Sequence, residues 1–146
     1  MIIFIKNCIS ITSSRQTRNA SHPREFLKGY DGICVTDGYQ VYHTLEKELE
    51  ELTIAGCWVH CRRRFDEALK LISKSYQKEF HAFLLMKQIQ AIYREEGKLN
   101  DLSSDERLKQ RQAVNKPLVD AFFAYLKTIN VSKKDKFGDD VGYARN

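Results

Sequence analysis

Residues 31–38 read Asp-Gly-Ile-Cys-Val-Thr-Asp-Gly, and this stretch decides the fold class. Its centre, residues 33–36, is a short apolar run between two Asp-Gly pairs, which is the pattern of a buried strand bounded by turns. Apolar runs at residues 1–11 and 53–59 predict two further strands. We therefore expect a central strand with one neighbour before it and one after it in the chain.

Helical segments separate these strands. A short helix is expected from Pro23 to Gly29, because proline costs no hydrogen bond in a first turn and glycine is typical of a helix end. The next helix is amphipathic with an acidic solvent side, and its apolar positions are Val41, Leu45, Leu49 and Leu52. Helical period returns after His60. This alternation predicts a layered α/β or α+β domain over residues 1–73, in which helices cover a sheet.

The second half of the chain, residues 74–146, carries no convincing strand pattern. Its apolar residues form broad helical stripes, and Ser103 with Glu106 makes a capping-box pattern. Pro117 can open a further helix. Residues 132–146 are basic and then acidic, and we recognise no capping or closing element there. We expect an all-helical insertion that starts to return to the sheet domain near its end.

The composition is that of an ordinary globular protein. The chain has 146 residues, enough for one compact domain, and no apolar run approaches the length that spans a bilayer. The apolar start lacks the basic segment and the cleavage pattern of a signal peptide. The 4 Cys lie in or beside apolar segments, as expected for reduced thiols in a cytoplasmic protein. A net charge of +5 is compatible with nucleic acid as a partner but does not decide it.

Asp37 is the most informative carboxylate, because it directly follows the predicted central strand. Ligand and metal sites favour this edge of the sheet in layered α/β domains. The alternative is that Asp37 caps the helix that begins near Tyr39, which is a common role of aspartate at such a junction. The residues alone leave both interpretations open.

Residues 57–61 read Cys-Trp-Val-His-Cys and invite a zinc interpretation. A structural zinc site needs four ligands, however, and no second Cys/His pair follows. The ordinary interpretation is that Cys57 and Trp58 belong to the core and that hydrogen bonds satisfy His60. One hypothesis for the function is therefore a small metal-binding protein that uses Cys57, His60 and Cys61.

Arg62, Arg63 and Arg64 form a basic cluster at the start of the following helix. On a helical wheel Arg63 lies opposite the apolar stripe, whereas Arg62 and Arg64 flank it. These side chains could reach phosphates at the sheet edge, since phosphate contacts need only positive charge and reach, or pair with Asp66 and nearby acids. We take all three arginines as candidate DNA-binding residues.

Several further motifs follow one another along the chain. They are Gly29-Tyr30-Asp31-Gly32, Thr36-Asp37-Gly38-Tyr39-Gln40-Val41-Tyr42, Cys57-Trp58-Val59-His60 running into Arg63-Arg64-Phe65, Asp105-Glu106-Arg107-Leu108 with Arg111-Gln112, Lys116-Pro117-Leu118, and Asp140-Val141-Gly142-Tyr143-Ala144-Arg145-Asn146. In this order they resemble the central domain of bacterial insertion-sequence transposases of the IS-sixty-six type. The resemblance spans nearly the whole chain.

The resemblance implies a ribonuclease-H-like fold with a helical insertion. It also implies a DDE active site, in which two Asp and one Glu bind Mg²⁺ or Mn²⁺, and DNA at the transposon ends as partner of the parent protein. Asp37 matches the second of these acids, which makes it a catalytic residue and a metal ligand. Two metal ions held by carboxylates can activate a water or a 3′-hydroxyl for in-line attack on a phosphodiester.

The resemblance also places the first Asp on a strand before Met1 and the Glu after Asn146. We do not assign Asp31, Asp66 or Glu67 to replace them. We therefore expect a partial ribonuclease-H-like domain, a fragment or degenerate copy of a transposase catalytic domain for DNA strand cleavage and strand transfer, that is inactive as an isolated chain. The alternative is a non-catalytic module that binds DNA, a second copy of itself or a full-length transposase.

Overall fold

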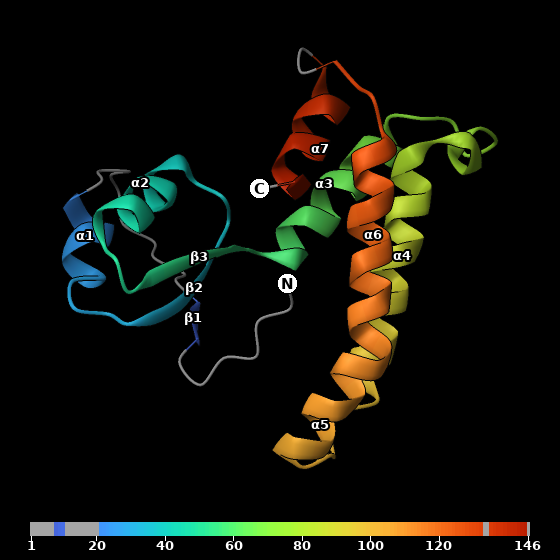
Figure 1. Cartoon of the computed structure of the whole chain (residues 1–146). Helices are drawn as coiled ribbons and strands as arrows, with labels where there is room; N and C mark the ends of the chain where they lie inside the picture. Colours follow the sequence, from blue (N-terminus) through green and yellow to red (C-terminus); the bar gives the residue numbers. More distant parts are fainter. Residues whose placement is uncertain (1–7, 11–20, 133–134, 146) are drawn as a thin grey trace. The chain divides into compact units, whose positions relative to one another are not determined.

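A computed structural model describes residues 8–10, 21–132 and 135–145 (Figure 1). The chain divides into two compact units, an N-terminal unit, Ile5–His60, and a C-terminal unit, Cys61–Asn146. The division falls earlier in the chain than Ser73, where the change of hydrophobic period suggests a boundary, and the predicted 1–73 and 74–146 domains stay a prediction. Among the described residues, no helix is both long and apolar enough to cross a membrane.

Three parallel strands form the sheet of the N-terminal unit, in the order β1-β2-β3. They are β1 (Cys8–Ser10), β2 (Gly32–Thr36) and β3 (Leu52–Gly56). In the register, Cys34 of β2 stands beside Ile9 on one side and Ile54 on the other. The expected central strand is confirmed, and so is the α+β class, because helices follow in both units. Residues 1–7 and 11 of the first predicted strand lie outside the described residues.

Two helices connect these strands, as parallel pairing requires. They are α1 (Ser21–Phe26) and α2 (Gln40–Glu48). The turn after α1 ends at Gly29, whose φ of 75° lies in the left-handed region that favours glycine. Glu46 of α2 reaches β3, where its Oε1 accepts a hydrogen bond from the Ile54 N–H at 2.7 Å. A side chain therefore satisfies a strand amide in this unit.

The core of the N-terminal unit forms around β2. Its buried side chains come from both helical segments and both long strands, and they are Leu27, Cys34, Leu45 and Leu52. Tyr30, Val41 and Tyr42 pack against this core while staying partly exposed. The strands and their connecting segments thus share one hydrophobic core. β2 ends at buried Thr36, and the chain leaves the core at exposed Asp37.

Three sequence-based element boundaries are wrong. The first helix begins at Ser21 and not at Pro23, and it ends at Phe26, with Gly29 in the turn that follows. Leu52 was expected to extend the stripe of the second helix, but α2 ends at Glu48 and Leu52 opens β3. The spacing of Leu49 and Leu52 continues the helical pattern, although these residues lie in a turn. A hydrogen bond from the Leu52 N–H to the Leu49 carbonyl at 3.1 Å closes this turn. The predicted strand 53–59 also ends early, because β3 stops at Gly56 and Trp58 already begins the next helix.

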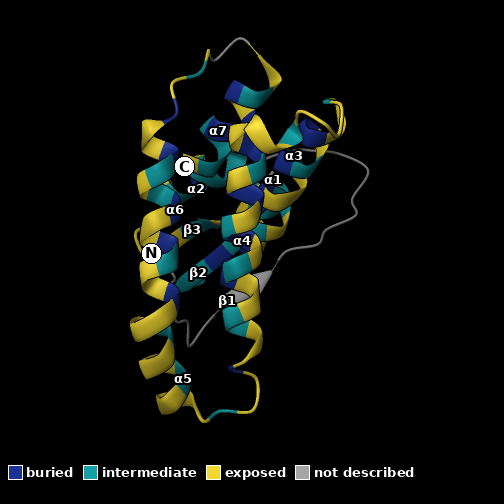
Figure 2. Ribbon diagram, turned by 90° about the vertical axis from the view of Figure 1, so that its right-hand side faces the viewer, coloured by how far each residue is buried: buried dark blue, intermediate teal, exposed yellow. Residues whose placement is uncertain are grey.

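All regular elements described in the C-terminal unit are helical, as expected (Figure 1). The α-helices are α3 (Trp58–Lys70), whose first three residues still belong to the N-terminal unit, α4 (His81–Gly97), α5 (Ser104–Gln110), α6 (Lys116–Thr128) and α7 (Lys136–Arg145). A 3₁₀ turn, η1 (Gln77–Glu79), precedes α4, and a π-helical turn, η2 (Arg111–Asn115), joins α5 to α6. Helices α4 and α6 lie side by side (Figure 2). Their buried side chains include Leu85, Ile89, Val119, Phe122 and Leu126.

Both predicted helix starts in this unit are confirmed. The Ser103 side chain accepts a hydrogen bond from the Glu106 N–H, and the Glu106 carboxylate accepts one from the Ser103 N–H at 3.1 Å, which completes the capping box. These bonds lower the pKa of the Glu106 carboxyl. Pro117 stands in the first turn of α6. Local capping chemistry therefore places α5 and α6 where the sequence predicts them.

Helix α7 contradicts the prediction that residues 132–146 contain no closing element. It is anchored by Arg145, whose Nη2 donates hydrogen bonds to the Leu126 and Ile129 carbonyls at 2.7 and 2.6 Å, at the end of α6. Its buried residues are Gly138, Asp140 and Val141. An apolar-period analysis misses this helix because only one of these three side chains is hydrophobic.

The close packing of Gly138 gives a direct test of α7. A Cβ at Gly138 would clash with the Ser132 carbonyl oxygen, whereas a Cβ at Gly142 meets nothing within 4 Å. We expect Gly138→Ala to lower the free energy of unfolding by about 1–3 kcal/mol, as overpacking does. Gly142→Ala, the matched control, should leave it unchanged or raise it by up to about 1 kcal/mol, because alanine favours helix. Urea unfolding followed by circular dichroism measures both, and equal effects would contradict the packing.

Candidate functional site

Asp37 lies at the carboxyl end of the central strand, directly after β2, and is exposed. Two hydrogen bonds shape the turn that carries it: the Tyr39 N–H donates to Asp37 Oδ1 at 3.1 Å, and the Gly38 N–H donates to Thr36 Oγ1 at 3.3 Å. Gly38 has a φ of 80°, which other residues rarely adopt. A defined turn therefore holds the Asp37 carboxylate at the rim of the sheet.

The capping interpretation of Asp37 does not match this geometry. The N-cap residue of α2 is Tyr39, and no side chain caps it. Asp37 accepts from the N–H of Tyr39 itself, not from an amide of the first helical turn, so its hydrogen bond closes the preceding turn. Within the described part of the chain, Asp37 Oδ2 accepts no hydrogen bond, which leaves this oxygen available to a ligand.

Tyr42, in the first turn of α2, lies within the electrostatic influence of Asp37. Burial, and in second place the negative charge of Asp37, raises the pKa of the Tyr42 phenol above its ordinary value of 10.0. Both causes favour the neutral phenol. The contribution of Tyr42 to stability is therefore complete below pH 10 and is lost as the pH rises through the raised pKa. The Tyr39 ring meets the Tyr42 ring edge-on, with 6.3 Å between their centres.

The described residues bring no further metal ligands together. Among them, no group of three His, Cys, Asp or Glu side chains is placed to hold a metal ion. Asp31 is exposed and precedes β2, so it stands at the opposite end of the strand from Asp37. His60 Nδ1 is buried and finds no hydrogen-bond partner among the described residues, so the hydrogen-bonded interpretation does not hold for this ring nitrogen. Asp37 is thus a single candidate ligand.

The three arginines of the basic cluster divide into two kinds. Arg62 and Arg63 are exposed, and neither side chain forms an ion pair within the described residues. Arg64 is instead bound: its Nη1 donates to Asp140 Oδ1 at 3.2 Å, and its guanidinium lies 4.5 Å from the centre of the Tyr143 ring. Arg64 therefore links α3 to α7.

The acids near this cluster are engaged as well. Asp140 is fully buried, and its Oδ1 also accepts a hydrogen bond from Lys136 Nζ at 2.8 Å. Asp66, the partner suggested by sequence, pairs with Lys70 at 2.7 Å instead. Asp140 lies 76 residues beyond Arg64 in the chain, so no sequence spacing could identify it as the partner of this arginine.

The basic excess of the chain belongs to its helical part. Residues 61–146 contain 18 Lys and Arg against 12 Asp and Glu, whereas residues 5–60 contain 6 against 7. Because a phosphate backbone attracts positive charge irrespective of sequence, the C-terminal unit is the more suitable of the two for contact with nucleic acid.

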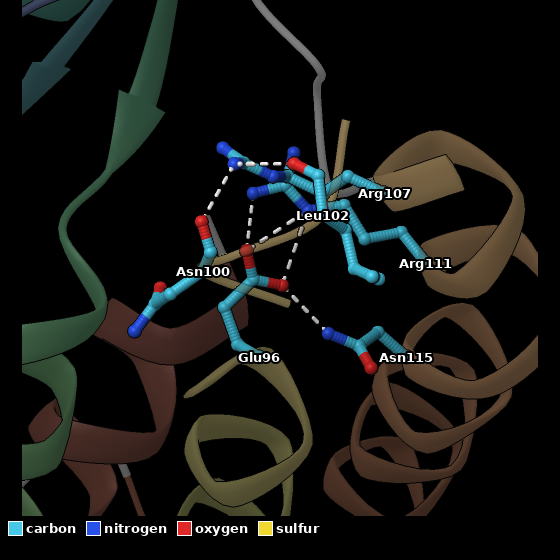
Figure 3. Close-up of polar contacts among 6 residues, drawn as sticks. All are labelled: Glu96, Asn100, Leu102, Arg107, Arg111 and Asn115. Atoms are coloured by element: carbon cyan, nitrogen blue, oxygen red, sulfur yellow. Dashed lines mark hydrogen bonds and ion pairs between the residues drawn. The ribbon is translucent and has the colours of Figure 1, made fainter. Parts of the chain in front are cut away.

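A polar cluster that the sequence analysis missed joins α4 to the π-helical turn (Figure 3). The Glu96 carboxylate accepts hydrogen bonds from Arg111 Nε at 2.8 and 3.2 Å, from Arg111 Nη2, and from Asn115 Nδ2 at 2.6 Å. Asn115 is only 1% exposed. Arg111 and Asn115 are four residues apart on one helical surface, but nothing in their spacing indicates Glu96 as the partner.

A second arginine orders the loop between α4 and α5. Arg107 Nη2 donates hydrogen bonds to the Asn100 and Leu102 carbonyls at 3.2 and 3.1 Å (Figure 3). Since the charged groups of this region bind one another and the backbone, their role is to fix the connection between α4 and α6.

Comparison with known proteins gives a family. Residues 7–146 match the family described as "Transposase IS66 family". Two similar proteins of Sinorhizobium fredii are the uncharacterized proteins y4hP and y4qI. The former is 29% identical over 119 residues, which are 75% of this chain and 22% of that protein. The latter is 29% identical over 135 residues, which are 87% and 24%. The chain thus spans about a quarter of these relatives' length. No solved structure matches it significantly.

The Glu96 cluster can be tested against the exposed Lys116–Asp120 ion pair of α6. The Arg111–Glu96 pair is 23% and 34% exposed, whereas Lys116 and Asp120 are 60% and 62% exposed. We expect Arg111→Met to lower the free energy of unfolding by about 1–3 kcal/mol, because Glu96 loses its charged donor. Lys116→Met, the control, should change it by less than about 0.5 kcal/mol. Chemical denaturation measures both, and similar losses would show that the cluster has no special role.

Proposed function

This chain belongs to the transposase IS66 family, and on that premise we propose that it forms part of a DDE catalytic domain with a ribonuclease-H-like fold. Such a domain cleaves DNA strands and transfers them during DNA transposition, and the helical C-terminal unit is its insertion. The observation that carries the proposal is the position of Asp37. It stands exposed at the carboxyl end of the central parallel strand, the edge at which ligand sites form in layered α/β domains.

In this proposal Asp37 is one ligand of Mg²⁺ or Mn²⁺, through Oδ2. Both ions prefer oxygen ligands, and the turn at Gly38 holds the carboxylate without engaging that oxygen. A bound metal pair would supply the charge that activates the attacking oxygen. The described residues offer one carboxylate at this rim, so they do not fit a two-metal centre on their own. Further ligands have to come from outside them, and we expect the chain alone not to cleave DNA.

DNA contacts are assigned to Arg62 and Arg63. Both are exposed, and neither is engaged by an acid within the described residues. Arg64 belongs to the basic cluster in sequence, but its charge is bound to buried Asp140. Its role in this proposal is to position α7. The protein would work beside DNA in the cytoplasm.

A second candidate function follows from the basic excess of residues 61–146. A module with this charge binds DNA, or joins a full-length transposase, without performing chemistry. Both candidate functions include DNA contacts by Arg62 and Arg63. They differ in that Asp37 binds a metal ion only in the first. Metal binding at Asp37 therefore discriminates the two.

Metal binding is tested by titrating Mn²⁺ into the ¹⁵N-labelled full chain. We expect selective paramagnetic broadening of the Gly38 and Tyr39 amide signals, because both amides adjoin the Asp37 carboxylate. Asp37→Asn should abolish the broadening. Asp31→Asn is the matched control, since Asp31 is an exposed acid at the other end of β2, and it should keep the effect. Broadening that survives Asp37→Asn would favour the non-catalytic module.

The same proteins are then incubated with DNA and Mg²⁺ or Mn²⁺, and no cleavage is expected. Cleavage that disappears in Asp37→Ala would show that the chain holds a complete site.

DNA contact is tested by fluorescence anisotropy with a labelled duplex over a range of salt concentrations. Arg62→Ala and Arg63→Ala should each weaken binding and reduce the salt slope by about one, as loss of one phosphate contact does. Arg64→Ala should keep the DNA affinity and lower the free energy of unfolding, because buried Asp140 loses a partner. A loss of affinity in Arg64→Ala as large as in Arg62→Ala would contradict the division of the cluster.

A further inference from the structure

The connection between α3 and α4 is largely exposed (Figure 2). Nine large apolar side chains are exposed in the described chain, and four of them fall within residues 71–84. They are Leu71 (79%), Tyr76 (61%), Phe80 (43%) and Leu84 (46%). Single exposed apolar residues are normal, whereas clusters of them mark interaction sites. The concentration of such residues here indicates a binding surface.

Lysines alternate with the aromatic residues of this connection. Residues 74–80 read Lys-Ser-Tyr-Gln-Lys-Glu-Phe, which places Lys74, Tyr76, Lys78 and Phe80 at every second position; we call these four residues the aromatic–lysine segment. Both lysines are exposed, and neither forms an ion pair within the described residues. Glu79 is the sole acid of the sequence between residues 71 and 87. The segment therefore combines unpaired positive charge with open aromatic rings.

The backbone of the segment is held in place. Gln77 Nε2 donates hydrogen bonds to the Leu69 and Ile72 carbonyls at 2.8 and 3.1 Å, which ties the 3₁₀ turn η1 to the end of α3. The Phe80 N–H donates to the Gln77 carbonyl at 3.1 Å, which closes the turn before α4. Because the turn is already ordered, little conformational entropy is lost when its exposed side chains bind a ligand.

We propose that the aromatic–lysine segment binds single-stranded DNA. Each nucleotide of a single strand offers an unstacked base and a phosphate, and the segment offers an aromatic ring beside a lysine twice in succession. Base–aromatic stacking tolerates any sequence, because every base has a π-face, and lysine attracts the backbone. Duplex DNA keeps its bases stacked and cannot use the rings. The inference rests on the proposed function only in taking DNA as the nucleic acid.

Charge favours a nucleic acid over an apolar protein partner. The unit that carries the segment has the basic excess of the chain, with 18 basic against 12 acidic residues. Several other surface lysines of the unit pair with acids, as Lys70 does with Asp66 and Lys116 with Asp120. Lys74 and Lys78 thus remain available beside the rings to complement a polyanion.

The test measures binding of the full chain to fluorescein-labelled oligothymidine by anisotropy. Tyr76→Ala and Phe80→Ala should each weaken binding roughly fivefold or more, the effect of losing one stacked base, and Tyr76→Phe should retain it. Phe26→Ala is the matched control, because Phe26 is 66% exposed and lies in the N-terminal unit. It should bind as the unchanged chain does. Lys74→Ala and Lys78→Ala should weaken binding and reduce its salt dependence.

Several results would overturn the proposal. Oligothymidine that does not bind at low salt is one, and alanine variants that bind like Phe26→Ala are another. An equal loss of affinity for duplex DNA would mean that the rings do not contact unstacked bases. If the variants instead break up a self-assembly seen by size-exclusion chromatography, with DNA affinity unchanged, the surface binds a second copy. Asp37→Asn should leave oligothymidine binding intact, so a failed metal test does not affect this one.

Discussion

The N-terminal unit depends on the burial of one parallel strand between two others. β2 pairs with β1 and β3, and its Cys34 side chain is fully buried among leucines of the flanking segments. A strand held on both sides has a fixed end, and the chain must leave it in a turn. That turn requires a positive φ at Gly38 and leaves Asp37 outside the core. The position of the candidate metal ligand is therefore a consequence of how the sheet is packed, and the hydrogen bond from the Tyr39 N–H then orients its carboxylate.

The C-terminal unit combines an apolar core with charged groups that are buried or partly buried. Asp140 is fully buried and accepts hydrogen bonds from Arg64 and Lys136 on a single oxygen, while Glu96 binds Arg111 and buried Asn115. Such groups add little net stability over an apolar core, but they penalise any other arrangement that leaves a charge buried and alone. They specify how α7 and the π-helical turn are placed. This explains why a basic cluster in the sequence contains one residue that is structural.

Local patterns predicted local structure well. The Asp-Gly pairs around residues 33–36, the capping box at Ser103 and the proline of α6 all stand as expected. The errors arise where contacts between distant parts of the chain determine the secondary structure. Helical spacing continued through the turn before Leu52, and α7 is held by Asp140 and Arg145, whose partners are distant in the chain. Asp37 was located by its place after a strand, whereas the state of Arg64 depended on a contact that no spacing encodes.

The contact between Glu46 and the Ile54 amide has a consequence for how the protein behaves at high concentration. An exposed strand edge with unpaired amides is a template onto which other chains add, and this leads to aggregates. At β3 an incoming strand would have to displace a carboxylate from the Ile54 N–H at 2.7 Å and leave that negative charge beside its own backbone. Glu46 thus discourages edge-to-edge polymerisation at this strand, and the small sheet keeps its size through a side chain of the helix that crosses it.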